Sequence, residues 1–223
     1  QSYWVEDYVQ NLNFPWAITW LPNGDLLVTE RLGKIKLIRN GKVIDELEGV
    51  PEVMASSPFD GLLDIKIDPD FKTQPYIYLS YTKGATTERV GVVYRAKIEN
   101  NKLVEGKEIF NTSPPAPTGG PNITRIQFLS DKSLVAAVGS SGQHAYGMVQ
   151  RLDGDIGKII RIYRDGTIPD DNALAVKNPN AKPELWATGL RSVGGLTLDD
   201  NNQLWAVEMG PQGGDELNLI EAG

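Results

Sequence analysis

The sequence predicts an all-β protein, a β-propeller with four blades in this chain, forming a single domain over residues 1–223. Two observations support this fold class. Short apolar runs rich in Val, Ile, Leu, Tyr and Trp alternate with Asn-Gly and Asp-Gly turns, and amphipathic helical patterning is almost absent. A unit of several strands also recurs four times, which is typical of propellers. We expect the blades at approximately 14–50, 60–112, 122–168 and 183–223.

Each predicted blade begins with a β-hairpin. In the first, residues 17–30 read AITWLPNGDLLVTE, where the Pro-Asn-Gly-Asp stretch predicts a turn between two strands. Related segments occupy residues 62–82, 123–139 and 194–210. Four such hairpins with polar tips indicate a repeated architecture rather than a plain sandwich.

A third strand follows each hairpin. The segment GKIKLIRNG at 33–41 closely resembles GKIIRIYRDG at 157–166, and residues 90–103 and 216–223 take the same place in the other two units. The equivalent positions Trp20, Ile67, Phe128 and Leu198 are spaced at or above the ~40–50 residues of a typical blade. The chain is too short for six blades, so it forms either a four-bladed ring or part of a six-bladed one. We expect the second, because it stops directly after a strand of the fourth blade.

Composition excludes several functions. The net charge is −7 and the pI is about 4.8, which argues against a nucleic-acid partner. No apolar run approaches the ~20 residues needed to span a bilayer. Cysteine is absent, so thiolate metal sites and cysteine nucleophiles are excluded. Because the chain begins with Gln1 rather than Met, we expect a removed leader and a periplasmic or extracellular location.

Several phrases in order along the chain resemble one family. These are FPWAITWLPNGDLLVTER, GLLDIKIDPDF, YIYLSYT, GKIIRI, DGTIPDDN, PELWATGLRS and GPQGGDELNLIEAG. Together they resemble the soluble quinoprotein glucose/sorbosone or aldose sugar dehydrogenases. The resemblance implies a six-bladed propeller that binds pyrroloquinoline quinone (PQQ) and Ca²⁺ at the channel mouth. It also implies oxidation of the anomeric hydroxyl of an aldose, with electrons passed to an external acceptor.

The same resemblance assigns cofactor and catalytic positions. The histidine that acts as the family's general base corresponds to Pro121, and its acidic partner corresponds to Ser140. A glutamine that contacts the cofactor corresponds to Phe59. The arginine that reaches the quinone is retained as Arg191, followed by Ser192 in place of asparagine. Arg191 and Ser192 are therefore the candidate cofactor-binding residues, with a blade-to-blade salt bridge as the alternative role of Arg191.

A metal site and a second candidate for the general base are also expected. The resemblance gives Gly210 and Pro211 backbone carbonyls that bind Ca²⁺, a cation that accepts such oxygens readily. The alternative is that this Gly-rich segment is only a turn. The single histidine, His144, is a candidate for a displaced general base, or else a solvated loop residue.

Two functions from different classes follow. The first is a PQQ- and Ca²⁺-dependent aldose oxidoreductase, impaired by the proline at the base position. The second is a non-catalytic propeller that binds a glycan, a metal or a protein partner, because one propeller architecture serves many functions.

Overall fold

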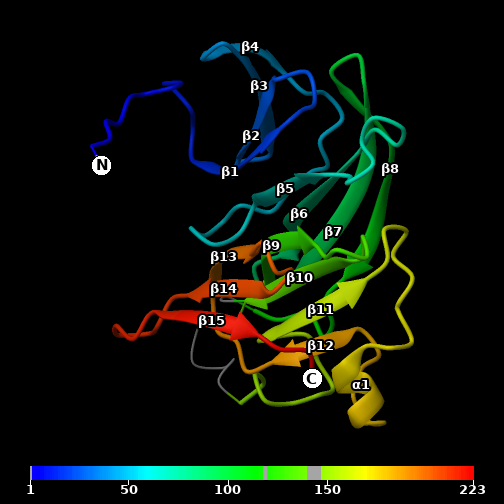
Figure 1. The fold of residues 1–223 in the computed structure, drawn as a ribbon. Helices are drawn as coiled ribbons and strands as arrows, with labels where there is room; N and C mark the ends of the chain where they lie inside the picture. Colours follow the sequence, from blue (N-terminus) through cyan, green and yellow to red (C-terminus); the bar gives the residue numbers. More distant parts are fainter. Residues whose placement is uncertain (1, 118–119, 140–146) are drawn as a thin grey trace.

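A computed structural model describes residues 2–117, 120–139 and 147–223. Its strands form four antiparallel sheets, which follow one another around a central axis (Figure 1). The predicted fold class, an all-β propeller with four blades, is confirmed. Within the described residues the one α-helix is the short α1, Ala173–Lys177. It is far too short to cross a membrane, and no described helix is long and apolar enough to do so.

Each blade is built from strands that are consecutive in the chain. Blade 1 contains β1 (Pro15–Trp20), β2 (Leu26–Glu30), β3 (Lys34–Arg39) and β4 (Lys42–Glu46). Blade 2 contains β5 (Leu62–Ile67), β6 (Tyr76–Ala85), β7 (Glu88–Glu99) and β8 (Lys102–Asn111). Blade 3 contains β9 (Asn122–Phe128), β10 (Leu134–Gly139), β11 (Lys158–Ile162) and β12 (Leu185–Thr188). Blade 4 contains β13 (Val193–Leu198), β14 (Leu204–Glu208) and β15 (Glu216–Ile220).

The opening hairpins correspond in register, as the repeat predicted. The last pair before each tip joins Trp20 with Leu26, and the matching pairs are Ile67–Ile77, Phe128–Leu134 and Leu198–Leu204. In blade 1 the tip is closed by Gly24, whose φ of 87° suits glycine, and by the Gly24 N–H donating to the carbonyl of Leu21. The turn chemistry in the sequence therefore fixes the pairing of each hairpin.

The boundary between blades 3 and 4 differs from the prediction. The sequence assigned residues 183–188 to the fourth blade, but β12 pairs antiparallel with β11 and completes the third. Leu185 is fully buried and Ala187 nearly so. The long connection from β11, which includes α1, returns the chain to the same sheet. This pairing depends on tertiary packing of a four-residue strand, which local patterning cannot show.

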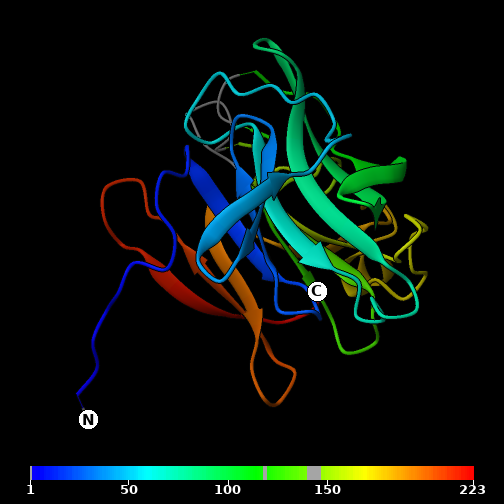
Figure 2. The same cartoon turned by 90° about the horizontal axis from the view of Figure 1, so that it is seen from above.

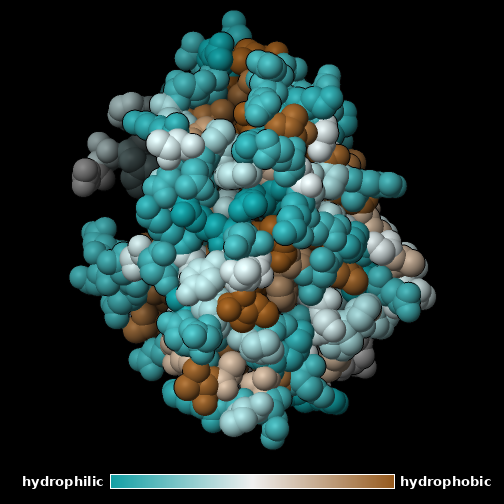
Figure 3. Space-filling view, turned by 90° about the vertical axis from the view of Figure 1, so that its right-hand side faces the viewer, coloured by the Kyte–Doolittle hydropathy of each residue, from teal (hydrophilic) through white to brown (hydrophobic). Residues whose placement is uncertain are grey.

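The blades are held together by apolar interfaces between their faces. One core cluster joins blades 1 and 2, a second joins blades 2 and 3, and a third joins blades 3 and 4. The clusters include Leu27 with Leu79, Tyr78 with Ile126, and Val135 with Leu196, respectively. The outer face shown in Figure 3 is mainly hydrophilic, with apolar residues scattered over it. Burial of apolar surface between sheets therefore provides the main stabilisation.

The innermost strands surround the axis. β1 packs against β5, β5 against β9, and β9 against β13. Blade 1 and blade 4 instead face each other across a cavity of about 470 Å³, which we call the channel cavity. Residues 16–18 line it from blade 1 and residues 194–197 from blade 4, and Figure 2 shows these blades from above.

Candidate functional site

A small pocket of about 140 Å³ lies at one end of the axis, and we call it the mouth pocket. Its lining comes from the beginnings of the inner strands, the ends of the second strands and two connecting loops. The residues are Trp16, Phe59, Asn122, Thr124, Arg125, Gly139, Ser192, Val193, Gly194 and Met209. Trp16, Arg125 and Gly194 also line the channel cavity, so the two spaces adjoin. Blades 1, 3 and 4, together with the loop before β5, therefore contribute to one site.

Large apolar side chains form part of the pocket wall. Phe59 and Met209 are 44% and 42% exposed. The Trp16 indole N–H donates to the carbonyl of Thr124 at 3.5 Å, and the Arg125 guanidinium lies 5.6 Å from the Trp16 ring centre. The site thus offers aromatic and thioether surface next to a cation, which suits a planar anionic ligand.

Arg191 is positioned by the end of β14. Its backbone N–H donates to Oε1 of Glu208 at 2.5 Å, and its guanidinium Nη1 donates to the carbonyl of Met209 at 2.6 Å. The second carboxylate oxygen of Glu208 accepts a hydrogen bond from the Asn218 amide at 3.0 Å. The backbone around Arg191 is therefore fixed by a buried carboxylate whose two oxygens both have donors.

Two buried polar atoms lack a hydrogen-bond partner among the described residues. One is Oγ1 of Thr124, which lines the mouth pocket, and the other is Nε of Arg191, the residue before the lining residue Ser192. Buried polar groups in native proteins are nearly always hydrogen-bonded, so each such atom requires an explanation. A bound ligand that presents oxygen atoms to the mouth pocket would provide a partner for the Thr124 hydroxyl.

The Gly-rich segment predicted as the metal site lies between β14 and β15. The Met209 N–H donates to the carbonyl of Ser192 at 3.0 Å, and the Gly210 N–H donates to Oδ1 of Asp215 at 2.9 Å. Any side chain at Gly210 would collide with the carbonyl of Gly213. Pro211 is exposed. The structure thus brings the predicted residues 191, 192 and 210 to one end of the molecule.

The other predicted positions have different outcomes. His144 and Ser140 lie outside the described residues. Pro121 is buried immediately before β9 and has no proton-accepting side chain. Phe59, at the position expected for a glutamine, forms part of the pocket wall.

Sequence reasoning missed Trp16, Thr124 and Arg125. Their signal was present, because Trp16 and Arg125 lie on the inner strands β1 and β9, where propeller side chains reach the axis. Identifying them required the alignment of blades 1 and 3 around the channel. The unpartnered Thr124 hydroxyl could be found only from the structure.

The channel cavity carries its own charged groups. Asp64 is 3% exposed and lines this cavity with Lys66 and Arg125. Burial raises the pKa of Asp64, although its oxygens accept backbone N–H groups from Ile65 and Ile126 at 2.9 and 2.8 Å and the two cations oppose the rise. The axis is therefore lined by two cations and a carboxyl group whose charge is disfavoured.

Comparison with known proteins places these features in context. The glucose/sorbosone dehydrogenase family model matches residues 12–223. An aldose sugar dehydrogenase from Escherichia coli is 34% identical over 98% of this chain and 60% of its own length. A quinoprotein glucose dehydrogenase from Acinetobacter calcoaceticus is 28% identical, over 96% of this chain and 50% of its own. The chain therefore spans between half and two thirds of the length of these relatives.

Solved structures agree with the sequence comparison. The apo-form of the soluble E. coli aldose sugar dehydrogenase has a TM-score of 0.88 at 33% identity, covering 95% of this chain and 62% of the other. The PQQ-bound form of an aldose sugar dehydrogenase from Streptomyces coelicolor has a TM-score of 0.81 at 31% identity, covering 98% and 63%.

Proposed function

Since this chain belongs to the glucose/sorbosone dehydrogenase family, we propose that its mouth pocket holds PQQ in an enzyme that oxidises aldoses at the anomeric hydroxyl. A Ca²⁺ ion beside the cofactor and an external electron acceptor are part of this proposal. The observation that carries it is the unpartnered Oγ1 of Thr124 among the apolar walls of the mouth pocket, with the unpartnered Nε of Arg191 on the residue before the lining residue Ser192. The similarity to the PQQ-bound aldose sugar dehydrogenase of Streptomyces coelicolor supports the choice of ligand.

The residues present fit a planar, polyanionic cofactor. Arg191 and Arg125 supply permanent positive charge, and a guanidinium can donate two parallel hydrogen bonds to a carboxylate. Thr124 supplies a hydroxyl, and Trp16 with Met209 supplies apolar surface. Ser192 lines the pocket and completes its polar part. The adjoining channel cavity gives room beyond the 140 Å³ of the mouth pocket itself.

The proposed Ca²⁺ ion depends on backbone oxygens. The described residues contain no group of three or more His, Cys, Asp or Glu side chains suited to a metal. The donors on offer are the carbonyls of Gly210 and Pro211, together with oxygens of the cofactor. Such hard, neutral donors are acceptable to Ca²⁺ at flexible geometry.

The chemistry divides between cofactor and protein. When bound, PQQ accepts a hydride equivalent from the anomeric carbon, and two electrons later leave for the external acceptor. The protein must take the hydroxyl proton, which needs a base within hydrogen-bond reach. Pro121 cannot do this, and Glu208 has donors on both of its oxygens. His144 stays a predicted substitute for the missing base.

The Pro121→His substitution tests this account of the reaction. Restoring a base at the start of β9 should raise dye-coupled aldose oxidation, measured as kcat/KM with PQQ and Ca²⁺ added, by about 10²- to 10⁴-fold. The substitution His144→Ala in the unmodified chain should remove any residual activity. If neither the unmodified chain nor Pro121→His shows PQQ-dependent turnover, the oxidoreductase proposal is wrong and a non-catalytic binding propeller is favoured.

A further inference from the structure

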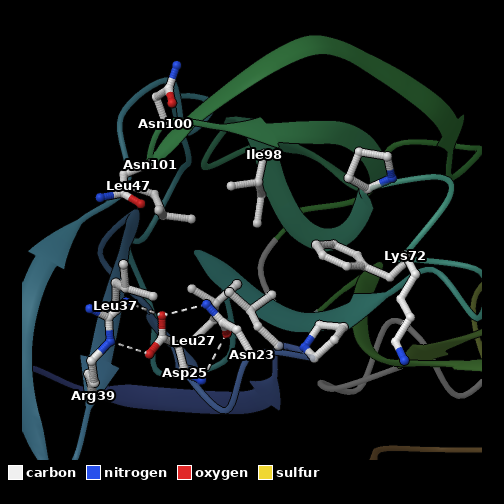
Figure 4. Close-up of a pocket in the computed structure, with 14 residues that line it drawn as sticks. Asn23, Asp25, Leu27, Leu37, Arg39, Leu47, Lys72, Ile98, Asn100 and Asn101 are labelled. Atoms are coloured by element: carbon white, nitrogen blue, oxygen red, sulfur yellow. Dashed lines mark hydrogen bonds and ion pairs between the residues drawn. The ribbon is translucent and has the colours of Figure 1, made fainter.

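A second pocket lies between blades 1 and 2, at the end of the propeller opposite the mouth pocket. We call it the inter-blade pocket, and its volume is about 450 Å³ (Figure 4). It is lined by the tip of the β1–β2 hairpin, the tip of the β5–β6 hairpin and the turn between β7 and β8. The residues are Leu21, Pro22, Asn23, Asp25, Leu27, Leu37, Arg39, Leu47, Phe71, Lys72, Pro75, Ile98, Asn100 and Asn101. No residue is shared with the mouth pocket.

Most of the inter-blade pocket is apolar. Leu27, Leu37 and Leu47 are no more than 4% exposed and form its floor from blade 1. Phe71 and Ile98 add apolar surface from blade 2. A ligand bound on this floor would bury its apolar surface away from water and would contact the aromatic ring of Phe71.

One side of the pocket is a prearranged polar cluster. The Arg39 Nε and Nη2 groups each donate to a carboxylate oxygen of Asp25 at 2.7 Å. The Asn23 amide donates to the same carboxylate at 2.9 Å, and its oxygen accepts the Asp25 backbone N–H at 3.0 Å. Figure 4 shows these three side chains together, with Lys72 on the other side of the opening. The cluster holds its shape without a ligand.

The free hydrogen-bonding capacity of this side suits a neutral polyol. Asp25 and Arg39 balance each other in charge. The other polar side chains of the lining are Lys72 across the opening and the amides of Asn23, Asn100 and Asn101, the last of which donates to Asp45 at 2.6 Å. Among the described residues, Nη1 of Arg39 and the Asn100 amide have no protein partner. Amide and guanidinium groups in a fixed plane match the hydroxyls of a sugar ring.

The corresponding gap between blades 2 and 3 is built differently. There the Arg164 guanidinium pairs with Asp68 at 2.8 Å and with Asp70 at 3.1 Å, and Lys132 pairs with Asp70 at 2.8 Å. In blade 1 the equivalent positions are Leu21 and Asn23. Asp68 and Asp70 lie one and three residues after Ile67, the last paired residue of β5, and Leu21 and Asn23 lie one and three residues after Trp20, the last paired residue of β1. Ion pairs therefore cross the gap between blades 2 and 3, whereas the gap between blades 1 and 2 has an open apolar floor.

We propose that the inter-blade pocket binds a neutral glycoside with an aromatic or branched apolar aglycone. The aglycone lies on Leu27, Leu37 and Leu47 against Phe71. The sugar hydroxyls are hydrogen-bonded by Asn23, Arg39 and Asn100. This inference is independent of the proposed oxidation, because it uses none of the residues at the mouth pocket.

Phenyl β-D-glucoside is the probe that tests the inference. Saturation-transfer NMR and amide shift titration should show binding with a Kd on the order of 0.1 mM, as expected for a ligand of this size. The side-chain amides of Asn23 and Asn100 should shift. Free glucose, which lacks the aglycone, should bind at least about tenfold more weakly.

Four variants, two in the inter-blade pocket and two controls, locate the probe. Phe71→Ala should raise its Kd by about fivefold to tenfold, whereas Gln74→Ala, on the same hairpin but facing blade 3, should leave it unchanged. Asn100→Gly, which tolerates the φ of 49° at this exposed turn, should weaken binding about threefold without loss of folding. The mouth-pocket variant Arg191→Met should have no effect. Absence of binding at 5 mM probe, on the order of fifty times the expected Kd, would overturn the inference. So would sensitivity to Arg191→Met together with indifference to Phe71→Ala and Asn100→Gly.

Discussion

At the scale of single residues, a buried glutamate organises the mouth pocket. Glu208 accepts the Arg191 N–H and the Asn218 amide, and Glu30 at the matching place in blade 1 accepts the Asn13 N–H at 2.7 Å. Both glutamates end the second strand of their blade, and both are buried. In both blades a buried glutamate therefore accepts a hydrogen bond from the backbone just before the inner strand, β1 or β13. Only the segment before β13 contains a candidate cofactor-binding residue, Arg191.

The Glu208→Ala substitution tests both the contribution of Glu208 to stability and its role in positioning Arg191. It leaves the Arg191 N–H without its acceptor, so the free energy of unfolding measured by urea titration should fall by about 1–3 kcal/mol. PQQ affinity should fall as well, because Arg191 loses its position. The matched control Glu30→Ala should destabilise by a similar amount with PQQ affinity retained. Equal PQQ affinity in Glu208→Ala and the unmodified chain would contradict the assigned role.

Asp64 should make the stability of the folded protein depend on pH, in a direction that follows from its pKa shift. Burial raises its pKa in the folded state, so the native protein binds this proton more tightly than the unfolded chain does. The stability contributed by Asp64 should therefore increase as the pH falls from neutrality towards the ordinary aspartate pKa of about 4.

The Asp64→Asn variant isolates this effect, because asparagine cannot ionise and most other groups cancel in the comparison. We subtract the free energy of unfolding of the variant from that of the unmodified chain. This difference should grow as the pH is lowered from about 7.5 to about 5, which is still above the ordinary pKa of an aspartate. A difference that stays constant, or shrinks, over this range would show that Asp64 remains fully charged in the folded protein.

At the scale of elements, single polar side chains tie neighbouring blades together near the axis. The Thr29 hydroxyl on β2 donates to the carbonyl of Leu63 on β5 at 2.7 Å. Asp64 on β5 accepts the N–H of Ile126 on β9, and Arg125 on β9 donates to the carbonyl of Gly194 on β13 at 2.8 Å. Each interface thus combines an apolar cluster with a directional bond, which fixes how the sheets are rotated against each other.

The Thr29→Val substitution tests the first of these links. Valine keeps the shape but removes the hydroxyl, which also accepts the Ala17 N–H at 3.0 Å, so two buried backbone groups lose a partner. We expect a loss of about 1–3 kcal/mol in the free energy of unfolding with an unchanged urea m-value. Thr19→Val on the half-buried β1 is the control and should change stability by less than about 0.5 kcal/mol. Equal effects at the two positions would argue against the inter-blade bond.

The elements also show what the sequence could predict. The four hairpins and their third strands followed from turn residues and alternation, because those signals are local. The pairing of β12 with β11 and the helix α1 within the connection at 163–184 did not, because their partners are set by tertiary packing. For the site, Arg191, Ser192 and Gly210 came from a family resemblance. Thr124 and Arg125 needed the spatial convergence of several blades.

At the scale of the whole molecule, blades 1, 3 and 4 and the loop before β5 build the mouth pocket together, while blades 1 and 4 remain apart across the channel cavity. Ile18 on blade 1 is 59% exposed, and Leu217 on blade 4 is 67% exposed. Both line the channel cavity, so its walls carry apolar side chains as well as charged ones. The net charge of −7 coexists with cations near the axis, where Arg125 and Lys66 lie beside Asp64. Local charge, rather than the overall balance, therefore governs which ligand the axis attracts.

The most direct test of the central claim is calorimetric titration of PQQ into the protein, with and without Ca²⁺. We expect one PQQ per chain in the presence of Ca²⁺, and an affinity weakened about tenfold or more in Arg191→Met. Lys132→Met, at the opposite end of the propeller, should bind as the unmodified chain does. Absence of binding heat both with and without Ca²⁺ would contradict the assignment of the mouth pocket as a quinone site.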